Sequence, residues 1–91
     1  MELTELRTQI DDIDRALIAL LERRMDVSAD IADYKLLHGK AILDEKREQE
    51  KLRSVRAQCR PETAELIAGV FASVMAASRG YQQARTEARH G

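Results

Sequence analysis

LTELRTQIDDIDRALIALLERRMDVSADIADYKLL, residues 3–37, is the stretch that decides the fold of this chain. Apolar side chains recur in it at alternating steps of three and four residues, which is the period of one face of an α-helix. The positions of this apolar seam are Leu3, Leu6, Ile10, Ile13, Leu17, Leu20, Val27, Ile31 and Tyr34. Because the pattern stops only near Gly39, we expect one helix over about residues 3–38.

The length of this helix favours self-association. About 35 residues at 1.5 Å per residue form a rod of ~52 Å, in a chain of only 91 residues. The remaining residues are too few to cover the rod, and a period of roughly 3.5 residues favours a left-handed crossing with a partner helix. The sequence therefore predicts that a second copy of the chain covers the seam.

Two shorter helices complete the predicted all-α fold. A highly charged helix is expected over about residues 43–58, and a third over about residues 61–86, where Pro61 suits the first helical turn. The apolar stripe of the third helix consists of Ile67, Val70, Val74 and Ala77. With only four Gly and one Pro, the chain has little room for a sheet and its turns, so residues 1–91 are interpreted as one helical domain.

Composition excludes several classes of function. A net charge of −1, from 15 basic and 16 acidic residues, argues against a nucleic-acid partner. No apolar run approaches ~18 residues, which argues against a membrane span, and the acidic start Met-Glu-Leu-Thr-Glu-Leu does not resemble a signal peptide. The single cysteine, Cys59, excludes an internal disulfide and is typical of a reducing compartment. We expect a cytoplasmic protein.

Arg24 occupies a position of the seam where the period calls for an apolar residue. Burying an unpaired charge costs several kcal/mol, so the guanidinium requires an anion. The anion is either a structural carboxylate, such as Asp14, Asp30 or Asp44 of a neighbouring segment, or an anionic ligand. The sequence around Arg24 leaves both alternatives open.

A second cation lies on nearly the same side of the long helix. Lys35 follows Arg24 by 11 residues, which places it about 20° away in azimuth and ~16 Å further along the axis. That gap matches the span of a small ligand held between two long side chains. Arg7 is rotated by about 100° from Arg24, so we expect it to reach the site of a partner chain in an antiparallel dimer rather than its own.

Further polar residues share faces on the two shorter helices. Asp44, Arg47 and Glu48 have the spacing i, i+3, i+4, and Ser78 and Gln82 the spacing i, i+4. Taken singly, each fits an ordinary solvated or salt-bridged helix surface. No Ser/His/Asp triad, metal-ligand cluster or glycine-rich phosphate loop accompanies them, so we predict neither a nucleophile nor a bound metal.

In its joint arrangement the chain resembles the all-helical (type II) chorismate mutases, over about residues 3 to 85. The resemblance is carried by Leu6-Arg7, Ile10, Ile13-Asp14, Leu20-Leu21-Glu22-Arg23-Arg24, Ile31-Ala32-Asp33-Tyr34-Lys35, Asp44-Glu45-Lys46-Arg47-Glu48, Ser78 and Gln82-Gln83. It implies an intertwined homodimer of three-helix chains whose active sites use residues of both subunits. It also implies the rearrangement of chorismate to prephenate, a step of aromatic amino-acid biosynthesis that needs no cofactor and no metal.

The resemblance assigns a role to each polar position. Lys35 and Gln82 are implied to be the catalytic donors to the ether oxygen of chorismate. The implied substrate-binding residues are Arg7 of the other subunit, Arg24, Asp44, Arg47, Glu48 and Ser78. Arg7 and Arg24 would bind the two carboxylates, and Glu48 would accept a hydrogen bond from the ring hydroxyl.

Other functions remain open on the same residues. A relative of this fold can act on isochorismate as a pyruvate-lyase, although the Asp44–Glu48 face favours the mutase pattern. A mutase acting on 4-amino-4-deoxychorismate is harder to separate, since Glu48 can accept a hydrogen bond from a hydroxyl or from an amine. A noncatalytic helical dimer would instead pair Arg24 and Lys35 with acids of the protein itself.

Overall fold

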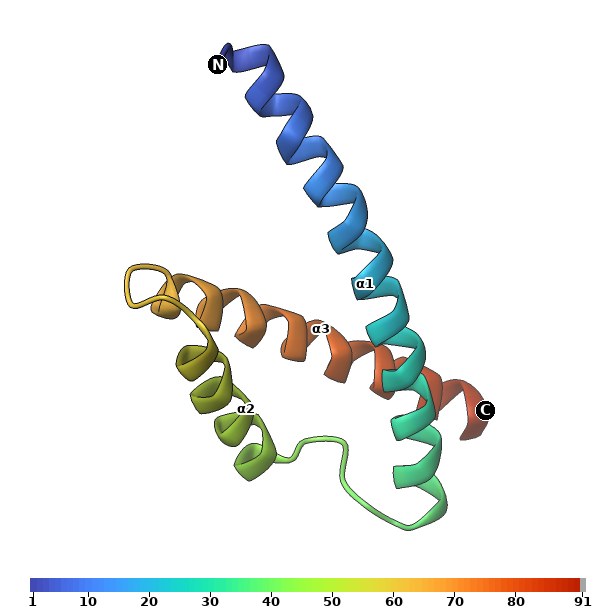
Figure 1. Cartoon of the computed structure of the whole chain (residues 1–91). Coiled ribbons are helices and arrows are strands. Elements are labelled where there is room, and N and C mark those ends of the chain that lie inside the picture. Colours follow the sequence, from blue (N-terminus) through green and yellow to red (C-terminus); the bar gives the residue numbers. More distant parts are fainter. Residues whose placement is uncertain (91) are drawn as a thin grey trace.

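The computed structural model of the chain describes residues 1–90 and contains three helices within them. They are α1 (Leu3–Leu37), α2 (Glu45–Gln58) and α3 (Ala64–His90), and no strand occurs among the described residues. Figure 1 shows α1 as a long rod that crosses α3 near the C-terminal ends of both helices. The predicted all-α class and the very long first helix are confirmed.

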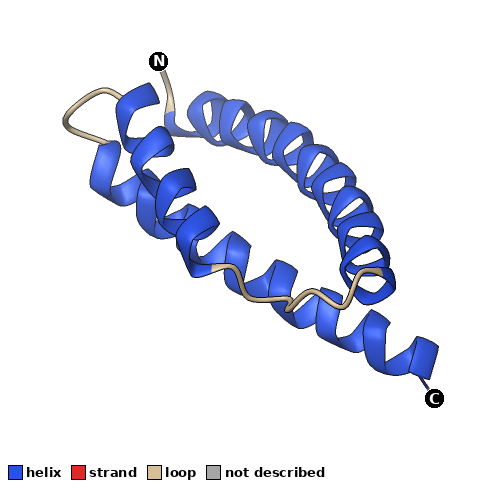
Figure 2. Cartoon of the chain, turned by 90° about the horizontal axis from the view of Figure 1, so that it is seen from below, coloured by secondary structure: helices blue, strands red, loops and turns tan. Residues whose placement is uncertain are grey.

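The left-handed backbone conformation of a glycine ends α1 where the sequence predicted the end. Gly39 has a φ of 62°, in the left-handed region that glycine adopts without a side-chain clash. The amide of Lys40 then donates to the carbonyl of Lys35 at 2.8 Å, which satisfies one of the free carbonyls of the last turn. The chain reverses there and runs through a loop to α2 (Figure 2).

The bounds of α3 differ from the prediction at both ends. Pro61 is not the first residue of the helix. The amide of Thr63 donates to the carbonyl of Arg60 at 3.1 Å and forms a separate turn, and the helix starts after that turn. At the other end α3 continues to His90 instead of stopping near residue 86. An ion pair from Arg89 to α1 holds this additional turn.

α3 packs against both of the other helices and holds them together. It contacts both α1 and α2, whereas α1 and α2 do not approach one another within the described residues. Figure 1 shows α3 running from α2 across to the C-terminal half of α1, while the N-terminal half of α1 projects away from the other two helices. A gap between α1 and α2 is therefore bordered on a third side by α3.

Small side chains form the interior of the single chain. The buried residues of α1 are Ser28, Ala29 and Ala32, and those of α3 are Ala68, Met75, Ser78 and Gln82. The predicted stripe of α3 does not face this interior, since Val70 is 57% exposed and Ala77 is also exposed. Small residues let two helix backbones approach closely, which hydrophobic periodicity alone does not reveal.

The apolar seam of α1 remains uncovered in the single chain. Its exposed side chains include Leu3 and Ile13, each with 60% of its surface open to solvent. The accessible surface is 7033 Å², against about 5,400 Å² for a compact monomer of this mass. The radius of gyration is 16.3 Å, against about 12 Å for a compact domain of this length. The chain is thus extended and presents a long apolar face.

No helix in the described part of the chain combines the length and the apolar character that crossing a membrane requires.

Candidate active site

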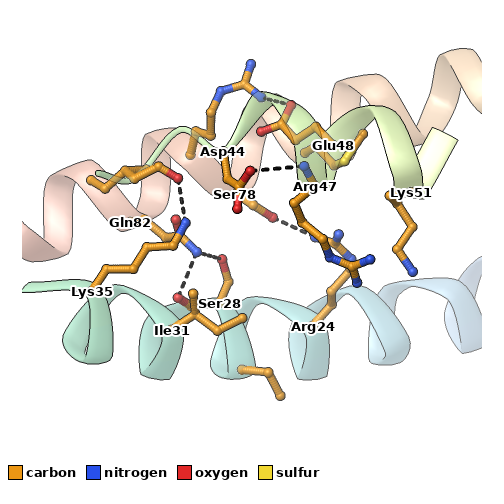
Figure 3. Close-up of a pocket in the computed structure, with 14 residues that line it drawn as sticks. Arg24, Ser28, Ile31, Lys35, Asp44, Arg47, Glu48, Lys51, Ser78 and Gln82 are labelled. Atoms are coloured by element: carbon orange, nitrogen blue, oxygen red, sulfur yellow. Dashed lines mark hydrogen bonds and ion pairs between the residues drawn. The ribbon is translucent and has the colours of Figure 1, made fainter. Parts of the chain in front are cut away.

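A pocket of about 490 Å³ occupies the gap between α1 and α2, against α3. Seven of the eight predicted site residues line it: Arg24, Lys35, Asp44, Arg47, Glu48, Ser78 and Gln82. In Figure 3 Arg24, Ser28 and Lys35 point up from α1, the lower ribbon, and Arg47 and Lys51 of α2 point toward them from above. Arg24 and Gln82, which are 58 residues apart in the sequence, therefore line the same cavity.

Arg24 is half-buried at the edge of this pocket, and its Nη1 donates to Ser78 Oγ at 2.7 Å. None of the ion pairs in the described residues involves Arg24, so these residues do not supply the anion that it requires. A guanidinium has five N–H donors, so most of its fork stays available to a ligand. The Ser78 hydroxyl has only a weak acceptor of its own, Met25 Sδ at 3.9 Å.

Lys35 lies at the other end of the pocket, as its azimuth on the long helix predicted. Its Nζ donates to the carbonyl of Ile42 at 2.6 Å, which ties the loop between α1 and α2 to this end of the cavity. An ammonium group has three donors, so two of them remain for a ligand.

Gln82 is buried, and its amide faces α1 rather than solvent. Nε2 donates to the carbonyl of Ser28 at 3.1 Å and to Ser28 Oγ at 2.9 Å (Figure 3). Because a backbone carbonyl only accepts, this contact fixes which end of the amide carries the hydrogens. Our sequence reasoning missed Ser28, although it lies four residues after Arg24 on the same face of α1.

Asp44 opens α2 as its N-cap residue, with Oδ1 accepting from the amide of Arg47 at 3.0 Å. The carbonyl of Asp44 accepts from the amide of Glu48 at 3.0 Å, so the cap and the first turn are fixed together. The face predicted from the i, i+3, i+4 spacing is thereby present in the pocket wall.

Two further cations line the pocket that sequence reasoning did not assign. Arg79 of α3 forms an ion pair with Glu48 through Nη1 and Oε1. Lys51 of α2 also lines the cavity and points into it in Figure 3. The available signal was their helical spacing, since Arg79 precedes Gln82 by three residues and Lys51 follows Glu48 by three.

The charges of the lining are strongly unbalanced. Five cations, Arg24, Lys35, Arg47, Lys51 and Arg79, stand against the two carboxylates of Asp44 and Glu48, a formal excess of three positive charges. The chain as a whole has a net charge of −1. The pocket is therefore a locally cationic site in a nearly neutral protein, suited to a small anion that carries more than one negative charge.

Arg7 does not line the pocket of its own chain. It is exposed on the projecting half of α1, and the 17 residues that separate it from Arg24 span ~26 Å of helix. Its assignment to the site of a second subunit stays a prediction.

Outside the pocket, an ion cluster fastens α1 to the C-terminal part of α3. Arg85 contacts Asp33 with both ends of its fork, at 3.0 and 2.9 Å, and Arg89 adds a contact at 2.9 Å. The hydrogen bond from Arg85 lowers the pKa of the Asp33 carboxyl below its ordinary value, and Asp33 in turn raises the pKa of Arg85. This cluster fixes the crossing that holds Gln82 against Ser28.

The comparison with known families decides how this pocket is classified. The family model described as chorismate mutase type II matches residues 6–83. The chain belongs to the type II chorismate mutase family. The resemblance inferred from the sequence is thereby confirmed.

A curated relative agrees with this assignment. The T-protein of Enterobacter agglomerans is 40% identical over 57 residues, which are 63% of this chain and 15% of that relative. The chain thus corresponds to a small part of the longer relative. No solved structure matches the chain.

Proposed function

We propose that this chain catalyses the rearrangement of chorismate to prephenate, in aromatic amino-acid biosynthesis, with neither a cofactor nor a metal. The observation that supports the proposal is the pocket itself, which gathers seven predicted positions from three helices around a cationic cavity. Family membership over residues 6–83 supports the same reaction. We further propose that the protein works in the cytoplasm, where the free thiol of Cys59 would stay reduced.

In the proposed mechanism the pocket first restricts the shape of the substrate. Chorismate has two carboxylates, an ether oxygen and a ring hydroxyl, and its reacting carbons approach only in a compact diaxial conformation. Arg24 and Ser78 would hold one carboxylate, and Arg47 would orient the ligand from the opposite wall. Holding reacting atoms in a near-attack geometry can contribute several kcal/mol, and an arginine fork suits this task because it binds a carboxylate bidentately.

The pocket then stabilises charge that develops in the transition state. As the carbon–oxygen bond breaks, negative charge builds up on the ether oxygen. Lys35 retains free N–H donors for it. Gln82 Nε2 has two hydrogens, and in the proposed complex one would stay on the Ser28 carbonyl while the other would leave Ser28 Oγ and donate to the ether oxygen. Fixed donors of this kind each contribute roughly 10²- to 10³-fold to the rate.

We propose that the active protein is a homodimer with shared sites, which Arg7 of the partner subunit completes. The uncovered seam supports this proposal, because the surface in excess of a compact monomer is about 1,600 Å² per chain. Burying that area from two chains corresponds to an interface of about 3,200 Å², within the range of obligate dimers.

One assay tests the reaction. Loss of chorismate absorbance is followed and the product is identified, and prephenate is the expected product. Release of pyruvate from isochorismate, or turnover of 4-amino-4-deoxychorismate alone, would show that the chain acts on a substrate other than chorismate. The absence of turnover on all three substrates would instead favour a noncatalytic helical dimer.

A mixing experiment tests the shared site. Arg7→Ala and Arg24→Ala chains are each expected to be inactive, and subunit exchange should recover activity because a heterodimer then contains one intact site. Mixing two preparations of the same variant is the control. If the mixed variants recover nothing although exchange is demonstrated, Arg7 does not act across the interface.

A further inference from the structure

We infer that Arg79 determines the preference of the pocket for a neutral ring substituent, by pairing with Glu48 before the substrate arrives. This inference rests on the proposed function, and concerns the choice between chorismate and its 4-amino analogue. Arg79 Nη1 donates to Glu48 Oε1, and both residues line the pocket. Glu48 Oε2 then remains to accept a hydrogen bond from the group on the ring.

The position of the pair ties it to the site. Arg79 lies on α3 directly after Ser78 and three residues before Gln82, so one helical turn carries all three pocket residues. Glu48 comes from the first turn of α2, four residues after the cap residue Asp44. The ion pair therefore sets the direction of the Glu48 carboxylate from the opposite helix.

The ion pair contributes little to the stability of the fold. The side chain of Arg79 is 35% exposed and that of Glu48 is 22% exposed, so water partly screens the attraction between them. A partly screened pair that lines a cavity is better explained by its effect on what enters the cavity.

The charge of the ring substituent determines how well the substrate binds in this pocket. The lining already has an excess of three positive charges, and Arg79 compensates the carboxylate nearest to it. A ring hydroxyl donates a hydrogen bond to Glu48 without adding charge. A protonated amine adds a cation to a site where the carboxylate is already matched, and like charges placed together disfavour binding. Without Arg79, Glu48 would be free to pair with that amine.

The test compares kcat/KM for chorismate and for 4-amino-4-deoxychorismate, at a pH at which the amine is protonated. Where the amine does not react, its inhibition constant against chorismate replaces kcat/KM. In Arg79→Met the preference for chorismate should fall by roughly tenfold or more, because the cation that repels the amine is gone. Arg79→Lys keeps a positive charge and should keep the preference within about twofold of the unchanged protein.

Arg85→Met is the matched control, since it removes another arginine–carboxylate pair between helices but lies outside the pocket lining. It should leave the preference unchanged, and circular dichroism verifies that each variant is folded. An unchanged preference in Arg79→Met, or an equal loss in Arg79→Lys or in Arg85→Met, would overturn the inference. Absence of chorismate turnover by the unchanged protein would instead refute the proposed function.

Discussion

Replacing Leu17 by aspartate should separate the proposed dimer into single chains. Leu17 lies in the middle of the apolar seam and has 49% of its surface exposed in the single chain. Fully burying a leucine contributes about 1.5–3 kcal/mol, so covering the exposed half contributes about 1 kcal/mol. A two-fold interface contains the site twice, and the apolar loss alone is then about 2 kcal/mol. That loss weakens the dimer about 30-fold.

The carboxylate increases this effect. Leaving a charge unpaired in an interface costs about 3 kcal/mol or more per copy, which raises the total to about 8 kcal/mol and the dissociation constant by about 10⁶-fold. Sedimentation equilibrium measures the constant directly. Thr8→Asp is the control, because it adds the same charge nine residues away, on the opposite side of the helix. A change smaller than tenfold in Leu17→Asp, or an equal change in Thr8→Asp, would refute the reasoning.

Three further predictions concern the pocket and the helix crossing. Lys35→Ala and Gln82→Ala should each lower kcat by roughly 10²-fold or more while sedimentation still shows a dimer; wild-type turnover in either would remove its assigned role. The Gln82 amide has its N–H donors whatever the pH, whereas a carboxyl group would first have to be protonated. We therefore expect kcat to change little between pH 6 and pH 8, and a steep loss in a pH–rate profile would contradict this. Arg85 lowers the folded-state pKa of Asp33, so the stability from this pair is complete above pH 3.8 and is lost as pH falls through the lower folded value. Acid unfolding followed by circular dichroism should therefore show less loss of stability below pH 4 in Asp33→Asn than in the unchanged protein.

The helices were predictable because their signals are local. The period of the seam and the glycine after it predicted α1 to within one residue at its end. The predicted start of α3 at Pro61 was wrong, because proline also suits the second position of a turn, and residues 60–63 form such a turn. The interior face was also not predictable, since small residues such as Ala32 form it and carry little hydrophobic signal.

The pocket was predictable where residues share one helix, and less so where helices meet. The azimuths of Arg24 and Lys35 placed both in the same cavity. Ser28 and Arg79 contact residues 54 and 31 positions away in the sequence, and helical spacing alone does not distinguish such residues from surface ones. Resemblance to the family supplied roles for the other positions, because a role depends on the ligand as well as on the fold.

The seam and the pocket are two parts of one surface. Val27 and Ile31 belong to the seam and also line the pocket, and they are 57% and 44% exposed. Arg24 interrupts the seam at the point where it becomes the wall of the cavity. A second chain that covers the seam must therefore pass over the edge of the pocket and exclude water from it, which strengthens every charge interaction inside. It follows that Leu17→Asp should lower kcat/KM together with dimer content, although Leu17 does not line the pocket.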